Sequence, residues 1–110
     1  MKIKNKKAFF NYEISDSFEA GIALTGAEVK SIKSGRINLS DAYVKIIGGE
    51  LWLVNADIPR YKYDGSEHYD SKRSRKLLVK KSEIVAIDSK LKQKNLTLLP
   101  LSVYTTSGKV

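Results

Sequence analysis

The sequence has no cysteine and a single histidine among its 110 residues. The absence of cysteine excludes disulfide scaffolds, thiolate metal sites and cysteine nucleophiles. Because His68 is the only imidazole, a histidine zinc site or proton relay would need a second chain. We therefore expect no metal, no cofactor and no catalytic residues.

Long apolar runs are also missing. No window approaches the roughly 18 consecutive apolar residues of a membrane-spanning helix. The N-terminus starts with lysines, but Asn11 and Glu13 interrupt the apolar stretch that follows, which argues against a signal peptide. We expect a soluble cytoplasmic protein with no membrane partner.

Charge is abundant, unbalanced and clustered. Twenty Lys and Arg against twelve Asp and Glu give a formal net charge of +8. Residues 2–7 hold four lysines, and residues 72–94 hold nine basic residues against two acidic ones. Such clusters can be ordinary solvated surface, but segregation favours a polyanion, nucleic acid before an anionic membrane.

The length allows one domain, residues 1–110. Short segments rich in β-formers, with no regular alternation of helices, predict a mainly β fold, a small antiparallel barrel with two short helices. Thr25 and Glu28 form a capping box that starts one helix, Gly35 ends it, and Ser82 starts the second. We expect strands at residues 8–14, 42–47, 51–54, 76–79, 96–99 and 101–104, with a turn at 48–50, a polar loop over 62–72 and a bend at Pro100.

Little in the sequence suits catalysis. It has no glycine-rich phosphate loop, and its carboxylates are scattered rather than paired near a base. A small hydrolase would need such a pair, so we expect a protein that is not an enzyme and has no small-molecule substrate.

The sequence has more features that suit nucleic-acid binding than features that suit catalysis. Four cations lie within residues 72–76, and in an extended segment Arg73 and Arg75 would project to the same side. Three tyrosines precede this run: Tyr61, Tyr63 and Tyr69. They could stack on exposed bases or lie partly buried under the loop, and the sequence leaves both readings open.

Six motifs follow one another along the chain: residues 5–8 (NKKA), 18–24 (FEAGIAL), 26–31 (GAEVKS), 35–41 (GRINLSD), 73–78 (RSRKLL) and 96–101 (LTLLPL). In this order they resemble the SmpB family, the SsrA-binding proteins of bacteria. The resemblance implies an OB-like antiparallel barrel that binds the tRNA-like domain of transfer-messenger RNA (SsrA RNA) without enzymatic activity. It also implies delivery of that RNA to stalled ribosomes for trans-translation and ribosome rescue.

The same resemblance implies an RNA-binding set. Its members are Glu19, Lys30, Arg36, Arg73, Arg75, Lys76, Leu78 and Lys80. A carboxylate on an RNA surface can accept hydrogen bonds from a base amino group or a ribose hydroxyl. Without the resemblance, the residue pattern favours Glu19 as a turn residue or as the partner of a nearby lysine. For Glu28 the capping role alone is expected.

The sequence departs from the family pattern in three places. Lys80 stands where the family usually has His or Asn, so the contact would be ionic, and Asn95 stands where glycine is usual. After residue 110 the family continues with a further strand and a long basic tail. We accordingly expect these 110 residues to bind RNA without supporting tagging. The alternative is a general binding module for tRNA or single-stranded nucleic acid.

Overall fold

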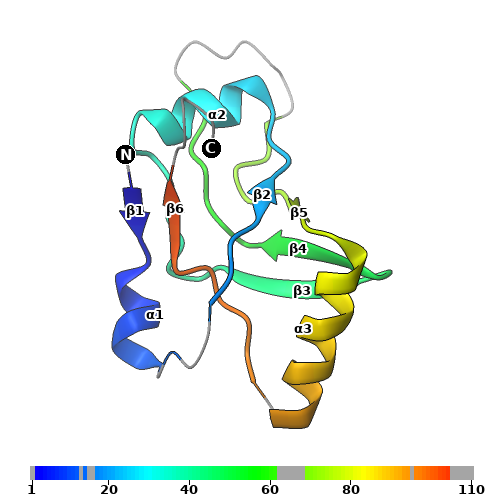
Figure 1. Ribbon diagram of the computed structural model, residues 1–110. Helices are drawn as coiled ribbons and strands as arrows, with labels where there is room; N and C mark the ends of the chain where they lie inside the picture. Colours follow the sequence, from blue (N-terminus) through cyan, green and yellow to red (C-terminus); the bar gives the residue numbers. More distant parts are fainter. Residues whose placement is uncertain (1, 13, 15–16, 62–68, 95, 105–110) are drawn as a thin grey trace.

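The structure is a computed structural model that describes residues 2–12, 14, 17–61, 69–94 and 96–104. Two antiparallel sheets form its centre (Figure 1). The smaller pairs β1 (Lys2–Lys4) with β6 (Ser102–Tyr104). The larger has the order β2-β5-β4-β3 and contains β2 (Gly21–Ile22), β3 (Tyr43–Ile47), β4 (Glu50–Val54) and β5 (Arg75–Leu78).

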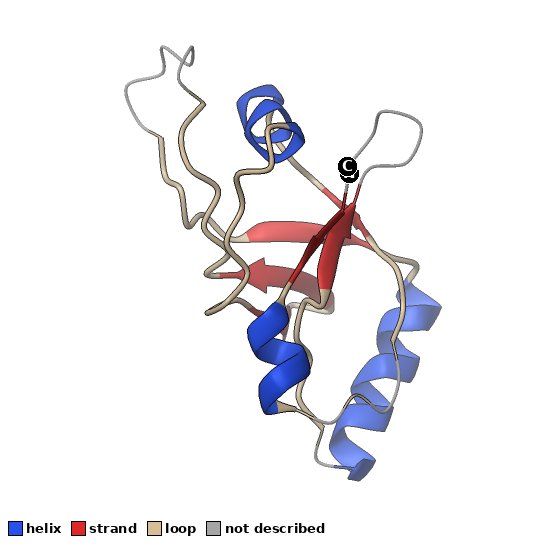
Figure 2. Cartoon of the chain, turned by 90° about the vertical axis from the view of Figure 1, so that its left-hand side faces the viewer, coloured by secondary structure: helices blue, strands red, loops and turns tan. Residues whose placement is uncertain are grey.

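In the described part of the chain, three helices flank the sheets. Helix α2 (Gly26–Lys33) lies at one end of the molecule, while α1 (Lys6–Asn11) and α3 (Lys81–Lys94) lie at the other (Figures 1 and 2). The predicted mainly β, antiparallel fold class is confirmed. Among the described residues the two sheets do not join into a closed barrel.

The β3–β4 hairpin forms where predicted. Its turn uses Gly48 and Gly49, with φ angles of 60° and 78°. Two successive left-handed residues match the twist of the flanking strands, which is why glycine suits both positions. The turn sets the register, in which Ile46 faces Leu51 and Val44 faces Leu53.

The predicted strand over residues 8–14 is wrong, because Lys6–Asn11 is a helix. The side chain of Asn5 caps it by accepting a hydrogen bond from the Ala8 backbone at 3.2 Å. This cap satisfies a free helical amide, and it outweighs the strand preference of the aromatic residues that follow. The described residues therefore form one helix more than the two that were predicted.

The other helices start close to their predicted positions. The capping box of α2 is present, with both the Thr25 hydroxyl and the Glu28 carboxylate bonded to backbone amides. Gly35 has a φ of 81° just after α2 ends, as predicted. Helix α3 starts slightly earlier than its predicted cap, since the amides of Glu83 and Ile84 bond to the Lys80 carbonyl.

The C-terminal half departs from the prediction at Pro100. Residues 96–99 are not a strand, and only Ser102–Tyr104 extend along β1. The carbonyl of Leu98 still accepts a hydrogen bond from the Val44 amide, and the carbonyl of Leu101 accepts one from the Asn5 amide. The segment is thus an ordered connection rather than a ladder strand.

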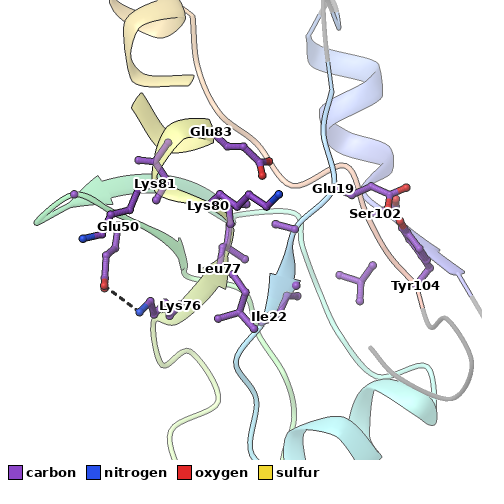
Figure 3. A pocket seen from close by; sticks show the side chains of 17 residues that line it. Glu19, Ile22, Glu50, Lys76, Leu77, Lys80, Lys81, Glu83, Ser102 and Tyr104 are labelled. Carbon is purple, nitrogen blue, oxygen red and sulfur yellow. Dashed lines mark ion pairs between the residues drawn. The ribbon is translucent and has the colours of Figure 1, made fainter. Parts of the chain in front are cut away.

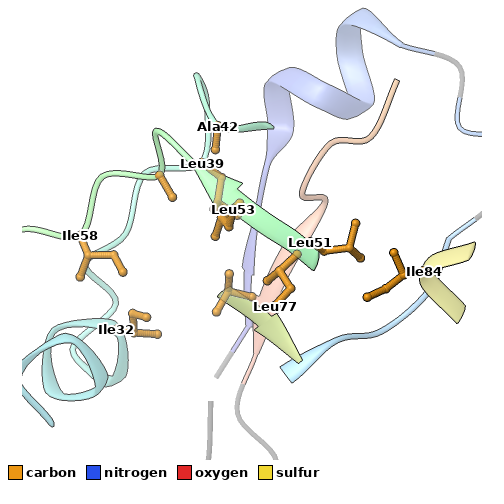
Figure 4. Packing of buried hydrophobic residues seen from close by; sticks show 10 residues of the cluster. Ile32, Leu39, Ala42, Leu51, Leu53, Ile58, Leu77 and Ile84 are labelled. Carbon is orange, nitrogen blue, oxygen red and sulfur yellow. The ribbon is translucent and has the colours of Figure 1, made fainter. Parts of the chain in front are cut away.

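One hydrophobic core joins α2, the larger sheet and α3 (Figure 4). It consists of ten buried residues: Ile32, Leu39, Ala42, Leu51, Leu53, Ala56, Ile58, Leu77, Ile84 and Val103. Alternate residues of β4 and β5 point into it, so the intervening residues face outward. No helix in the described part of the chain has the length and apolarity to cross a membrane.

Candidate nucleic-acid interface

Three charged residues form an ionic cluster at the start of α2, in which Glu28 and Arg75 are buried and the Arg73 side chain is 41% exposed. Glu28 belongs to α2, Arg75 is the first residue of β5, and Arg73 lies just before it. Both guanidinium groups donate to the Glu28 carboxylate, Arg73 to Oε1 and Arg75 Nε to Oε2 at 2.7 Å. The prediction that Arg73 and Arg75 project to the same side is confirmed. We call these three residues the ionic cluster.

Arg75 is completely enclosed, with 0% of its surface exposed. Besides bonding to Glu28, it donates to the Ala56 carbonyl at 2.7 Å and the Ser71 carbonyl at 3.0 Å. Arginine suits this position because its planar fork reaches several acceptors in fixed directions. The expectation that Arg75 belongs to the exposed basic surface is therefore corrected: its charge is used inside the fold.

Glu28 does more than cap a helix. Burial on its own raises the pKa of this carboxyl. The hydrogen bonds from the Thr25 amide, Arg73 and Arg75, with the charge of Arg75, more than offset burial and hold the pKa below its usual value. The carboxylate is thus kept ionised and ties the start of α2 to β5.

A separate open groove of about 910 Å³ lies among β2, β5, β6 and the start of α3 (Figure 3). We call it the groove. Four residues of the predicted RNA-binding set line it: Glu19, Lys76, Leu78 and Lys80. They come from separate stretches of the chain, and the fold brings them together as the family resemblance implied.

Lysines supply the positive side of the groove. Lys80 lies at the start of α3, and its exposed neighbour Lys81 also lines the groove. Lys76 is paired with Glu50 at 3.0 Å, so part of its charge is neutralised (Figure 3). Lys80 and Lys81 are consequently the cations best placed for a phosphate.

The opposite end of the groove carries a carboxylate and a phenol. Figure 3 shows the Glu19 and Tyr104 side chains next to each other. The hydrogen bond between them, together with burial and the negative charge of Glu19, raises the pKa of Tyr104. Tyr104 therefore lies beside the Glu19 carboxylate at the groove wall.

Leu78 provides an apolar surface between these two ends. It is 54% exposed, although it belongs to a strand that crosses the core. Its partner across the ladder is Gly21, where an added Cβ would come within 3.3 Å of the Leu78 side chain. The missing side chain at Gly21 lets Leu78 lie flat against β2 and remain accessible.

The remaining predicted residues lie elsewhere. Lys30 is on α2, 5.7 Å from the centre of the Tyr61 ring, and Arg36 is exposed just beyond that helix. Neither lines the groove. Tyr69 is half-buried and donates to the Ile58 carbonyl at 2.5 Å, which supports the burial reading for this tyrosine. Tyr63 and His68 lie outside the described residues.

Sequence reasoning missed Tyr104 and Gly21 as groove residues. Tyr104 reaches the groove only because β6 folds back beside the start of the chain, a pairing that no local pattern encodes. No group of three metal-ligating side chains is present among residues that the structure describes.

Comparison with known proteins places the chain in a family. The family model described as SmpB protein matches residues 2–110. An SsrA-binding protein of Dehalococcoides mccartyi is 52% identical over 100 residues, covering 91% of this chain and 58% of the relative. An SsrA-binding protein of Chlamydia muridarum is 44% identical over 106 residues, covering 96% of this chain and 70% of the relative.

A solved structure gives the same result. A chain from "tmRNA-SmpB: a journey to the center of the bacterial ribosome" superimposes with a TM-score of 0.79 at 38% sequence identity. The alignment covers 98% of this chain and 76% of that one. The chain therefore spans part of the length of these relatives, 58% for the one from Dehalococcoides mccartyi.

Proposed function

The chain belongs to the SmpB protein family, and from this premise we propose that it binds the tRNA-like domain of transfer-messenger RNA through the groove. It delivers that RNA to stalled ribosomes for trans-translation and ribosome rescue. It acts in the cytoplasm as a binding protein without enzymatic activity. The observation that carries the proposal is the convergence of Glu19, Leu78 and Lys80 on one open groove.

The groove offers three kinds of contact to a folded RNA. Lys80 and Lys81 face phosphates as point charges, which supply affinity that depends on salt. The Glu19 carboxylate, which lies beside Tyr104, accepts hydrogen bonds from a ribose 2′-hydroxyl or a base amino group. Leu78 packs against the apolar face of a base or ribose. A groove with a carboxylate in it favours one shape of RNA over others.

The relatives support this proposal. Those cited above are called SsrA-binding proteins, and the solved relative is described with transfer-messenger RNA and the ribosome. The family match runs from residue 2 to residue 110 and so includes every segment that supplies a groove residue, although Lys80 departs from the usual family residue. A general nucleic-acid-binding module would not need the acidic wall at Glu19.

Reversing the charge at the start of α3 tests the proposal. We expect K80E/K81E to bind the tRNA-like domain about 10- to 100-fold more weakly, measured as a Kd by filter binding over a range of salt. The slope of log Kd against log salt should also fall, by about 0.7 to 0.9 for each phosphate that the variant no longer neutralises. Acidic side chains are favourable near a helix N-terminus, so we expect the variant to keep its fold.

The matched control is K92E/K94E, which makes the same charge change at the other end of α3. It should change the Kd less than about threefold. Equal weakening in the two variants would show that net charge, and not the groove, determines binding. Competition with an unrelated tRNA adds the second check, because a general module would bind both RNAs equally well.

A further inference from the structure

Helix α1 presents aromatic side chains to solvent. Phe10 is 90% exposed, Phe9 is 50% exposed, and Tyr12, which caps the helix, is 51% exposed. We call these three residues the aromatic face. Scattered apolar side chains are normal on a protein surface, but neighbouring aromatic residues on one short element are typical of an interaction site.

The exposure is not caused by a loosely attached helix. The Asn5 side chain donates to the Leu39 carbonyl at 3.0 Å and to the Pro100 carbonyl at 2.9 Å, in addition to capping α1. Ala8 is the buried residue of α1. Because Asn5 and Ala8 fix which side of α1 faces inward, the aromatic face is held outward. Figure 2 shows α1 beside the smaller sheet.

The surroundings of the aromatic face are basic. Four lysines lie within residues 2–7, and one of them, Lys7, is bonded to Asp41 at 3.3 Å. A hollow of about 320 Å³ beside α1 is lined by Lys7, Tyr12 and Tyr43, among others. The Lys45 ammonium group lies 5.8 Å from the centre of the Tyr43 ring. Lysines and aromatic rings thus share this surface with the Asp41 carboxylate, which also lines the hollow.

A second copy of the chain is a poor occupant for this surface. A six-residue helix offers far less than the roughly 800 Å² per partner of a standard interface. Each copy would also bring the same cluster of lysines into contact. RNA fits better, since bases stack on aromatic rings while lysines neutralise the phosphates between them.

We propose that the aromatic face, with the lysines of residues 2–7, binds a single-stranded RNA segment, and that it is a second site separate from the groove. None of Phe9, Phe10 and Tyr12 lines the groove. This second site does not depend on the groove's binding the tRNA-like domain. Stacking and phosphate contacts make it tolerant of sequence and sensitive to salt.

The first test is the affinity for a fluorescein-labelled 12-nucleotide oligouridine, measured by anisotropy. We expect F9S/F10S to weaken binding about tenfold, because base–aromatic stacking is removed. The matched control is Val85→Ser, which removes a 70% exposed apolar side chain from α3 and should leave the Kd unchanged. Phe10→Ser alone tests the same face with the least effect on folding, and urea unfolding confirms that each variant is folded.

The second test is photo-cross-linking to an oligonucleotide that contains 5-iodouridine. We expect cross-links at Phe9, Phe10 or Tyr12, and we expect them to persist in K80E/K81E. An unchanged Kd in F9S/F10S, or cross-links only at groove residues, would overturn the proposal. The first of these results would instead assign the aromatic face to a protein partner. The groove variants are measured with the tRNA-like domain and the aromatic-face variants with an oligonucleotide. A negative result for one site therefore leaves the proposal for the other site unaffected.

Discussion

The ionic cluster and the groove both include residues of the four-residue strand β5, yet charged side chains are mostly buried in the first and exposed in the second. In the ionic cluster, Arg75 and Glu28 are buried and each bonds to several partners. In the groove, Lys81 and Leu78 are exposed, and Glu19 lies away from the lysines, although Glu50 and Glu83 lie among them (Figure 3). The first arrangement stabilises the fold, and the second leaves groups available for a ligand.

The comparison shows why a run of basic residues in the sequence does not form a single exposed surface. Side chains alternate along β5, so Arg75 and Leu77 point inward while Lys76 and Leu78 point outward. Burial of Arg75 is possible because Glu28 and two backbone carbonyls accept the hydrogen bonds that its guanidinium group would otherwise donate to water. Position along the strand, more than residue type, decides which of these cations are exposed.

Removing the carboxylate from the ionic cluster is the most disruptive change we predict. Glu28→Ala leaves the enclosed Arg75 without its counter-ion and also removes half of the capping box. We expect the free energy of unfolding to fall by about 3–5 kcal/mol, which urea denaturation would measure. A decrease in the free energy of unfolding as small as that expected for substituting an exposed residue would mean that the cluster is not a buried ion pair in solution.

Asp88→Ala provides the matched control. It removes one carboxylate from an exposed i,i+4 pair with Lys92 on α3. Such pairs contribute only about 0.3–0.5 kcal/mol, so stability should change little. A large destabilisation in this control would undermine the contrast between buried and exposed charge.

Lowering the pH should weaken the ionic cluster, with a smaller effect on the free energy of unfolding than Glu28→Ala has. The pKa of Glu28 lies below its ordinary value of 4.5 in the folded protein. Its contribution to stability is therefore complete above the unfolded-state pKa and is lost as the pH falls through the lower folded-state pKa. The stability of Glu28→Gln should depend less steeply on pH below about 5 than that of the parent, measured by urea unfolding at several pH values. Identical slopes would contradict the ionised, hydrogen-bonded state.

Much of the fold follows from local signals in the sequence. Gly48 and Gly49 specify the hairpin, and the pair Thr25 and Glu28 specifies the start of α2. The helix α1 was missed because its start is fixed by Asn5, whose partners are Leu39 and Pro100, far along the chain. Tertiary hydrogen bonds of this kind overrule the strand preference of the aromatic residues in α1.

The site was predictable only in part. The family resemblance pointed to Glu19, Leu78 and Lys80, and the fold gathers them, although direct contact with RNA stays a prediction for each. The burial of Arg75 depends on a carboxylate 47 residues earlier in the chain. Composition and spacing carry no signal for such a pair, since an exposed arginine and a buried one look the same in sequence.

Lysine reactivity, with and without the tRNA-like domain, tests most directly whether the groove is the RNA-binding region. Every lysine in one sample is labelled with an amine-reactive reagent and read by mass spectrometry. We expect Lys80 and Lys81 to lose most of their reactivity when the RNA binds, while Lys92 and Lys94 keep theirs. Full reactivity at Lys80 and Lys81 in the complex, with protection confined to lysines outside the groove, would contradict the assignment.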